Sequence, residues 1–424
     1  MKQFEKTAFS AAEILLPRPE HLSEAWAVCA CDQYTGEPAY WAETDRLVGD
    51  RPSTLRLILP EVYLEDADVT ERIAKIQQAM RDDLSAGIFR ELHDAMIYVE
   101  RIQSDGKCRA GLVGKIDLEQ YDYSKGSDTP VRATEATVAE RIPPRMRIRR
   151  GAAMELPHIM ILLDDAEKTV IEPLADGKDS MELLYDTKLM QGGGSIRGWL
   201  VPAAEQARIL KALTALGDSA RFDEGTAPLV YAMGDGNHSL ATAKAFYEEW
   251  KAANPGADTE NAPQRYALVE LVNLHSPALE FEAIHRILTE IDAEKLLADM
   301  TAALGLTEGA SDAAQQFTVI LNGKKTVYSV TKPSSNLTVG SVQGFLDGWL
   351  KANGGKIDYI HGAEVVENLA KAAHSMGILL PDMQKSELFP TVIKDGALPR
   401  KTFSMGHAAD KRFYMEARLL GASV

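Results

Sequence analysis

The chain contains 424 residues, of which 45% are hydrophobic and 25% are charged, as in an ordinary globular protein. Because domains usually contain about 100–200 residues, we expect two or three of them. The formal net charge of −16 would repel nucleic-acid phosphates, which argues against a nucleic-acid partner.

The sequence offers no membrane or secretion signal. No apolar run approaches the ~18 residues that span a bilayer, and the N-terminal segment lacks the apolar core of a signal peptide. The three cysteines, Cys29, Cys31 and Cys108, form no metal-binding pattern and suit a reducing compartment. We therefore expect a cytoplasmic protein without a membrane partner. Cys29 and Cys31, two positions apart, are expected on one face of a strand.

In the first third of the chain, short strands alternate with helices. Strands are predicted at 25–30 and 53–59, and a helix is predicted at 69–86. The segments 95–103 and 111–118 predict a hairpin, because the Asp-Gly pair between them accepts the positive φ angles of a tight turn.

Five arginines gather in residues 141–150 (RIPPRMRIRR), and two interpretations stay open. Such clusters usually lie in solvent or neutralise neighbouring acids, of which this chain has 62. Alternatively, Arg145, Arg147 or Arg149 reaches a phosphate bound elsewhere in the chain.

A strand is predicted at 157–163, and a glycine-rich stretch follows at 188–198. Its three consecutive glycines, Gly192 to Gly194, are a second candidate for a phosphate-binding loop. No Gly-Lys-Ser/Thr closes the stretch as in a Walker loop, so a hinge or hairpin turn is the favoured interpretation.

The most informative segment is 227–250, APLVYAMGDGNHSLATAKAFYEEW. A β-type run at 228–233 ends in the turn Gly234-Asp235-Gly236-Asn237-His238-Ser239, and an amphipathic helix follows at 240–250. Glycines allow a ligand to approach the backbone closely, and a helix N-terminus offers unpaired N–H groups and a positive dipole end. The turn therefore has the features of an anion-binding site.

A purely structural role for this turn is the competing interpretation. Asn237 and Ser239 belong to the residue types that cap helices, and Asp235 belongs to those that close turns. His238 favours the functional interpretation, because no cap requires an imidazole and a histidine there can carry a proton or donate to a phosphate.

In the C-terminal part, Asn322-Gly323 joins two β-type runs and predicts a hairpin. Helices are predicted at 340–352 and 363–375. The segment 278–288 is interpreted as a helix, in which His285 and Arg286 point away from an apolar face. Two interpretations stay open: His285 is a partly buried structural histidine, or His285 and Arg286 both face the site.

In order along the chain, several segments resemble the DUF1015 family, a group of uncharacterised bacterial and archaeal proteins. The matching segments are the DGNHS turn (a DGHHR-type signature), 51–61, 111–123, 131–137, 278–288 and 376–398. The resemblance implies that Glu135, His285, Arg286, Lys385 and Ser386, the last two expected in a loop, belong to the site. Lys385 is then a counter-charge for a phosphate.

Three departures from the family pattern bear on activity. Ser239 replaces an arginine, Thr134 replaces a histidine, and Cys29 to Tyr34 replaces a Pro-Pro-Tyr-Asp segment. An arginine would hold a phosphate with two hydrogen bonds, whereas Ser239 offers one hydroxyl.

The turn also resembles that of ParB/sulfiredoxin-type folds, which include kinases acting on free serine. The predicted strand 195–202, helix 203–216 and strand 228–233 precede the turn helix, and another strand follows at 266–274, in an order compatible with that fold. The expected fold is α/β, with mixed sheets and a ParB/sulfiredoxin-like nucleotide-binding unit at 180–300. Mixed α/β regions at 1–179 and 301–424 are expected to flank it.

The leading functional hypothesis is a small-molecule phosphotransferase using ATP or ADP with Mg²⁺. Asp235 acts as base or Mg²⁺ ligand, His238 as phosphate donor or acid, and Glu135 as a further catalytic carboxylate. The remaining candidates bind the nucleotide: Gly234, Gly236, Asn237, Ser239, His285, Arg286, Lys385 and Ser386. A nucleotide- or metabolite-binding regulatory protein without turnover is the alternative.

Overall fold

The computed structural model describes residues 6–311 and 315–421. The chain divides into two units, of which the first contains Met1–Ala133, Thr137–Leu279 and His407–Val424, and the second contains Thr134–Ala136 and Glu280–Gly406. The C-terminal segment thus belongs to the first unit. The three regions expected from the sequence, 1–179, 180–300 and 301–424, stay a prediction.

The first unit is built mainly on one large sheet. The strands of this unit are β1 (Phe9–Ser10), β2 (Ala12–Pro17), β3 (Phe89–Ala95), β4 (Ile97–Ile102), β5 (Cys108–Asp117), β6 (Tyr121–Asp122), β7 (Val131–Arg132), β8 (Met154–Glu155), β9 (Met160–Leu163), β10 (Glu182–Lys188), β11 (Ser195–Leu200), β12 (Tyr231–Asp235), β13 (Tyr266–Asn273) and β21 (Arg418–Leu419). Of these, β2 pairs with β3 and β8 with β21 in separate two-stranded sheets. Its α-helices are α1 (Pro38–Val48), α2 (Val69–Ser85), α3 (Ile142–Arg149), α4 (Pro173–Gly177), α5 (Ala203–Leu216) and α6 (Asn237–Ala253).

The large sheet has the order β10-β11-β4-β5-β13-β9-β12-β7-β6, with β1 added on β5. The pairs β13–β9, β12–β7 and β6–β7 are parallel and the other pairs are antiparallel. The order β11, α5, β12, α6, β13 is the one expected for a ParB/sulfiredoxin-like unit. The expected fold class, α/β with mixed sheets, is confirmed.

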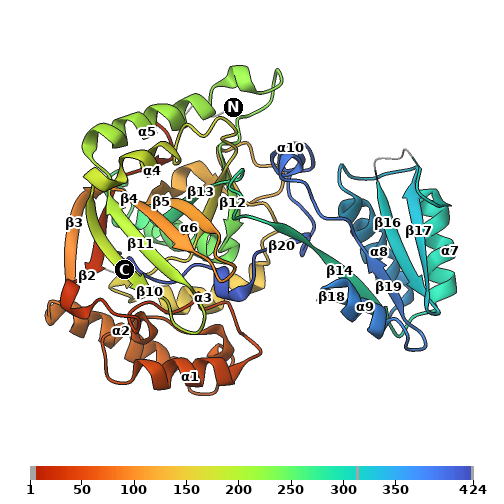
Figure 1. The fold of residues 1–424 in the computed structure, drawn as a ribbon, viewed down its shortest axis with the longest axis horizontal. Coiled ribbons are helices and arrows are strands. Elements are labelled where there is room, and N and C mark those ends of the chain that lie inside the picture. The colour runs from red at the N-terminus through yellow and green to blue at the C-terminus, as the bar shows by residue number, and fades with distance from the viewer. Residues whose placement is uncertain (1–5, 312–314, 422–424) are drawn as a thin grey trace. The chain divides into compact units, whose positions relative to one another are not determined.

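Both faces of this sheet are covered. On β13, Leu268 belongs to one hydrophobic core and its neighbours Ala267 and Val269 belong to another, because successive strand residues point to opposite faces. Met80 of α2 packs in the first core and Ile209 of α5 in the second. Figure 1 shows these two helices on opposite sides of the sheet.

The second unit has its own mixed α/β architecture. Its strands are β14 (Phe281–Thr289), β15 (Leu306–Glu308), β16 (Gln316–Leu321), β17 (Lys324–Val330), β18 (Lys356–His361), β19 (Met376–Leu379) and β20 (Phe403–Met405), and its α-helices are α7 (Ala293–Leu304), α8 (Thr338–Asn353), α9 (Ala363–Leu369) and α10 (Lys385–Asp395). The sheet order is β15-β17-β16-β19-β14-β18, and β20 pairs with β14.

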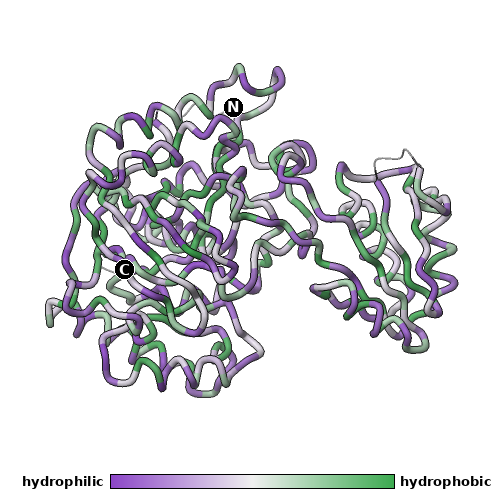
Figure 2. Tube along the Cα trace, viewed as in Figure 1, coloured by the Kyte–Doolittle hydropathy of each residue, from purple (hydrophilic) through white to green (hydrophobic). Residues whose placement is uncertain are grey.

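Several predicted elements are confirmed where local sequence decides the structure. Helix α2 and the β4–β5 hairpin form as expected. The β16–β17 turn places Asn322 and Gly323 at φ angles of 53° and 76°, as a type I′ hairpin turn requires. The three consecutive glycines connect the antiparallel strands β10 and β11, which agrees with the hairpin interpretation. Figure 2 shows hydrophilic and hydrophobic residues alternating along the outer helix α5.

Other predictions are wrong. Residues 25–30 do not form a strand: residues 25 and 26 lie in a turn, and Cys29 makes only an isolated β-bridge to Phe413. Within 53–59, residues Thr54–Leu57 form a 3₁₀ helix, because the Ser53 side chain accepts a hydrogen bond from the N–H of Leu55 and so favours a turn over a strand.

The segment around His285 is strand β14, not a helix. It pairs with β18, β19 and β20, and such partners override a local helical pattern. Lys385 and Ser386 also differ from expectation, because they open helix α10 instead of lying in a loop. A capping box between Gln384 and Glu387 fixes this start. Across the described ranges, no helix has the length and apolar character that crossing a bilayer requires.

Candidate functional site

The turn after β12 has the strand–glycine–helix geometry expected from the sequence. Gly236 has a φ angle of 78° and α6 begins at Asn237, earlier than the predicted start at 240. A Cβ atom at Gly236 would lie 3.0 Å from the Cα atom of Ile159, so both the conformation and the space demand glycine. His238 and Ser239 therefore lie in the first helical turn, where the N–H groups of a helix have no helical acceptor.

Strand register brings a further histidine to this turn. Asp235 at the end of β12 pairs with Met160 at the start of β9, which places His158 beside the start of α6. The His158 Nε2 atom lies 3.1 Å from the Ser239 hydroxyl oxygen, and its Nδ1 atom lies 2.7 Å from the hydroxyl oxygen of Tyr414. His158 is 5% exposed, so these two hydrogen bonds fix the imidazole from both sides.

An acidic side chain completes the environment of His158. The Asp32 Oδ2 atom lies 3.6 Å from His158 Nε2. Burial alone would lower the pKa of His158, but the Asp32 charge and hydrogen bond raise it above its usual value. Burial likewise opposes ionisation of Asp32, yet the His158 charge, the hydrogen bonds to Asp32 and the Lys411 charge lower the pKa of this carboxyl. Each side chain therefore favours the charged form of the other.

Lys411 supplies a cation at the turn. Its Nζ atom lies 3.2 Å from the Asp235 Oδ2 atom, and the two side chains are 12% and 17% exposed. The other oxygen of Asp235 accepts a hydrogen bond from the N–H of Gly236 at 3.0 Å. Sequence reasoning missed Lys411, since it lies 176 positions after Asp235 in a segment without a motif.

The remaining turn residues contact the segment before α3. The N–H of Val138 donates to His238 Nε2 at 3.3 Å, so a neutral His238 carries its proton on Nδ1. The Asn237 amide donates to the Thr137 hydroxyl at 3.4 Å. A direct hydrogen bond from His238 to a phosphate would thus come from Nδ1.

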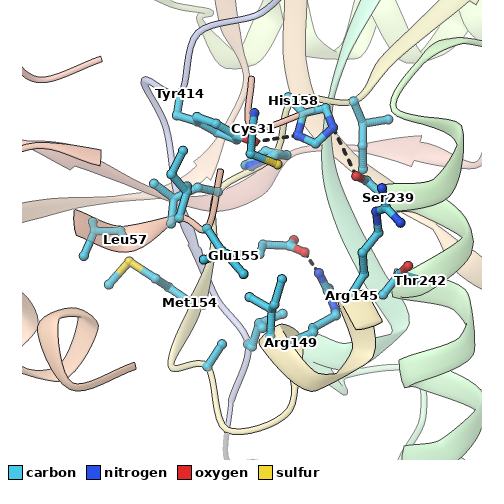
Figure 3. A pocket seen from close by; sticks show the side chains of 18 of the residues that line it. Cys31, Leu57, Arg145, Arg149, Met154, Glu155, His158, Ser239, Thr242 and Tyr414 are labelled. Atoms are coloured by element: carbon cyan, nitrogen blue, oxygen red, sulfur yellow. Dashed lines mark hydrogen bonds and ion pairs between the residues drawn. The ribbon is translucent and has the colours of Figure 1, made fainter. Parts of the chain in front are cut away.

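A cavity of about 140 Å³ adjoins the turn (Figure 3). Its lining is largely apolar, and the polar side chains on its wall are Cys31, Glu61, Arg145, Arg149, Glu155, His158, Ser239, Thr242 and Tyr414. Ser239 is shared between the turn and the cavity, but Asp235 and His238 do not line it. Of the candidate residues Asp235, His238 and Ser239, only Ser239 therefore belongs to both the turn and the cavity wall.

Two arginines of the cluster line this cavity, and both are paired with carboxylates. Arg145 forms an ion pair with Glu61, and Arg149 lies 2.5 Å from a carboxylate oxygen of Glu155. The neutralising interpretation therefore describes both arginines. They also share the cavity wall with Ser239.

The family-derived candidates from other segments lie in the second unit. Glu135 forms a bridge with Leu398. Arg286 is buried and donates to the Gln343 side chain at 3.0 Å, and burial lowers the pKa of its guanidinium to about 10. His285 accepts a hydrogen bond from the N–H of Leu380 at 3.2 Å. Because neighbours on a strand point to opposite faces, His285 and Arg286 do not share one face.

Lys385 is half-buried in the same unit, and burial lowers the pKa of its ammonium group while the charge of Glu280 opposes that shift. Ser386 follows it in the first turn of α10. It stays a prediction that Glu135, His285 and Lys385 belong to the same site as Asp235.

Stability should depend on pH through His158. A raised pKa means that this imidazole stabilises the fold fully below its unfolded value of about 6.5, and that the contribution disappears as the pH rises through the folded value. We expect His158→Gln to flatten the fall in unfolding free energy between pH 6.5 and 9, measured by urea denaturation. Asp32→Asn should flatten it too, because the carboxylate causes the raised pKa. A wild-type profile in both variants would contradict the ion pair.

The fold and the turn define a mixed α/β protein with a glycine turn at a helix N-terminus beside a partly apolar cavity. The chain belongs to the family described as "Protein of unknown function (DUF1015)", whose model matches residues 12–349. The comparison with curated proteins gives no match.

The solved structures that match this chain share little sequence with it. A C-terminally truncated SbnI from Staphylococcus aureus is 10% identical with a TM-score of 0.39, covering 73% of this chain and 87% of that chain. A conserved hypothetical protein from Pyrococcus furiosus is 11% identical with a TM-score of 0.35, covering 69% and 90%. A free serine kinase in complex with AMP is 11% identical with a TM-score of 0.38, covering 73% and 92%. At these values, the likeness carries nothing about activity.

Proposed function

We propose that this protein is a small-molecule phosphotransferase that binds the phosphates of ATP or ADP at the turn Gly234 to Ser239. The observation that carries the proposal is the pairing of Asp235 with Lys411 at a glycine turn that opens helix α6. Phosphoryl transfer mainly needs positioned positive groups and a group that orients the acceptor hydroxyl. The turn brings both kinds of group together.

The positive groups come from the backbone and from Lys411. The first N–H groups of α6 and its dipole favour an anion at this end of the helix. Lys411 directly follows the 3₁₀ helix Ala408–Asp410 and contacts the turn through Asp235. It supplies the charge that the family pattern places in an arginine at position 239. A lysine acts on a phosphate as a point charge rather than as a bidentate clamp.

Asp235 is the acceptor-orienting group in this proposal. A carboxylate has about four lone-pair directions, of which Lys411 and the N–H of Gly236 use two. The others can accept the proton of an acceptor hydroxyl. The acceptor oxygen then bonds to the terminal phosphorus, the bond from that phosphorus to the leaving phosphate oxygen breaks, and the hydroxyl proton passes to Asp235 and on to solvent.

Asp235 also fits a Mg²⁺ ion, which proteins usually hold by one or two carboxylates together with substrate phosphates. Bound there, the ion would neutralise negative charge on the nucleotide phosphates. Among the residues that the structure describes, Glu13, Glu91 and His93 are a group of three possible ligands, and they are exposed and apart from the turn. Asp235 would thus share the ion with phosphate oxygens.

A nucleotide- or metabolite-binding regulator is the second candidate function. The contacts of Asp235 with Lys411 and Gly236 favour it, because they are also what a purely structural carboxylate would make. Calorimetry with ATP and ADP, followed by detection of a phosphorylated acceptor, separates the two. Binding without any product would support the regulator, and an absence of nucleotide binding would overturn both nucleotide-based candidates.

Lys411 should contribute to nucleotide affinity. We expect Lys411→Ala to weaken ADP binding by about 10-fold or more, since a charge-assisted hydrogen bond contributes roughly 1.5–3 kcal/mol. Calorimetry at fixed ionic strength measures the effect. The matched control is Lys211→Ala, on the exposed face of α5, which should keep wild-type affinity. Equal affinities for all three proteins would show that the phosphates bind elsewhere.

A further inference from the structure

The cavity beside the turn has two chemically different sides. Its apolar side is formed by residues from several segments, including Leu57, Met80, Ile148, Ala152 and Met154. These side chains belong to or pack against the core that also holds α2. An apolar lining of this kind favours an apolar ligand group.

The hydrogen-bonding side of the cavity lies at the start of α6, and the ion pairs of Arg145 with Glu61 and of Arg149 with Glu155 also line the cavity. Figure 3 shows His158, Ser239 and Tyr414 joined by hydrogen bonds on one side of the cavity, with Thr242 one turn further along α6. The Ser239 hydroxyl shares one hydrogen bond with His158 Nε2 and can form a further one with a ligand hydroxyl. The turn that we assign to the phosphates begins at this same point.

The size of the cavity limits the ligand. An apolar cavity of about 150 Å³ holds one benzene molecule, and this cavity measures about 140 Å³. An apolar group of about six carbons therefore fills it. A small polar metabolite such as serine would leave the apolar wall uncovered.

We propose that this cavity binds the acceptor, and that the acceptor is an alcohol or hydroxy acid with an apolar body about the size of a benzene ring. The body occupies the side lined by Leu57, Met80 and Met154, and the hydroxyl lies at Ser239, which the cavity shares with the turn that holds Asp235, the proton acceptor of the proposed function. This assignment rests on the proposed phosphotransferase function, because the hydroxyl is then the group that receives the phosphate at the adjoining turn.

Binding of 3-phenyllactate and lactate to the full chain without nucleotide tests the pocket independently of transfer. The two compounds share the hydroxyl and carboxylate and differ by the phenyl ring. We expect 3-phenyllactate to bind at least 10-fold more tightly, as burial of a ring of this size implies, with affinities measured by NMR titration. Equal affinities, or binding of neither compound, would overturn the proposal.

Two variants locate the binding. Ala152→Phe fills the apolar side and should lower the affinity for 3-phenyllactate by at least 10-fold. Ser239→Ala is a smaller change, which tests the proposal even if Ala152→Phe fails to fold. It should lower the affinity for 3-phenyllactate about 2- to 10-fold, as the loss of one hydrogen bond implies. It should leave 3-phenylpropionate, which lacks the hydroxyl, unchanged. Ser85→Ala, at the exposed end of α2, is the matched control and should bind both compounds like the wild type.

The results separate this proposal from the proposed function. Binding of 3-phenyllactate by a protein that does not bind ATP or ADP would support the cavity and overturn the phosphotransferase. Binding of nucleotide with no preference for the phenyl compound would overturn the cavity assignment and leave the phosphotransferase standing. A wild-type affinity for 3-phenyllactate in both Ala152→Phe and Ser239→Ala would also overturn the cavity assignment.

Discussion

Replacing Asp235 by alanine is expected to lower phosphoryl transfer by about 10²- to 10⁴-fold, the usual contribution of a positioned acid or base. Nucleotide binding should persist or become tighter, because the substitution removes a negative charge and releases Lys411 from its ion pair. Backbone N–H groups at the start of α6 do not depend on this side chain. Calorimetry and a coupled transfer assay with an alcohol acceptor measure the two effects separately.

The control for this experiment is Asp186→Ala, which removes an exposed carboxylate from strand β10. It should retain wild-type binding and turnover. Transfer by Asp235→Ala at the wild-type rate would remove this carboxylate from the mechanism. Loss of nucleotide binding in that variant, with the fold intact, would instead make Asp235 a binding residue, through Mg²⁺ or through Lys411.

A large loss of stability is expected from breaking a buried ion network that holds the C-terminal segment. Arg412 lies 2.8 Å from a carboxylate oxygen of Glu270 and 2.6 Å from one of Glu416, and all three side chains are at most 2% exposed. Arg109 is a further cation near Glu270, at 3.8 Å. Burial would raise the pKa of Glu270, yet the charges of Arg109 and Arg412 keep it below the usual value.

Glu270→Ala should therefore lower the free energy of unfolding by about 3–5 kcal/mol, the usual cost of leaving buried charges without their partner. Urea denaturation measures this loss. Glu43→Ala breaks the exposed pair with Arg46 and should change stability little, since solvent screens such pairs. A loss below about 1 kcal/mol for Glu270→Ala would mean that the network reorganises. Because Lys411 precedes Arg412, the same network positions the lysine at the turn.

Short-range signals made parts of this structure predictable. The Asn322-Gly323 turn, helix α2 and the junction from β12 to α6 depend on residues only a few positions apart, so their patterns are visible in the chain. The same holds for Gly236, whose positive φ angle follows from its place between a strand and a helix. The resemblance to DUF1015 proteins likewise rested on short motifs, and the family is confirmed.

Three predictions are wrong, one because distant strands override a local pattern and two because a local side-chain hydrogen bond decides the structure. The 278–288 segment has helical spacing of apolar residues, but three strands pair with it and make it β14. The apolar run at 53–59 suggests a strand, yet the hydroxyl of Ser53 stabilises a 3₁₀ helix there. The sequence predicts a loop at Lys385, but the capping box of Gln384 and Glu387 starts helix α10 at this residue.

The sequence by itself determined the mixed α/β class, the family and the Gly234 to Ser239 turn, because composition and neighbouring residues encode them. Only the tertiary structure brought Asp32, His158 and Lys411 to this turn. Their positions depend on the register of β9 against β12 and on the return of the C-terminal segment to the first unit. Such contacts arise from pairing and burial between segments far apart in the chain, which no local pattern records.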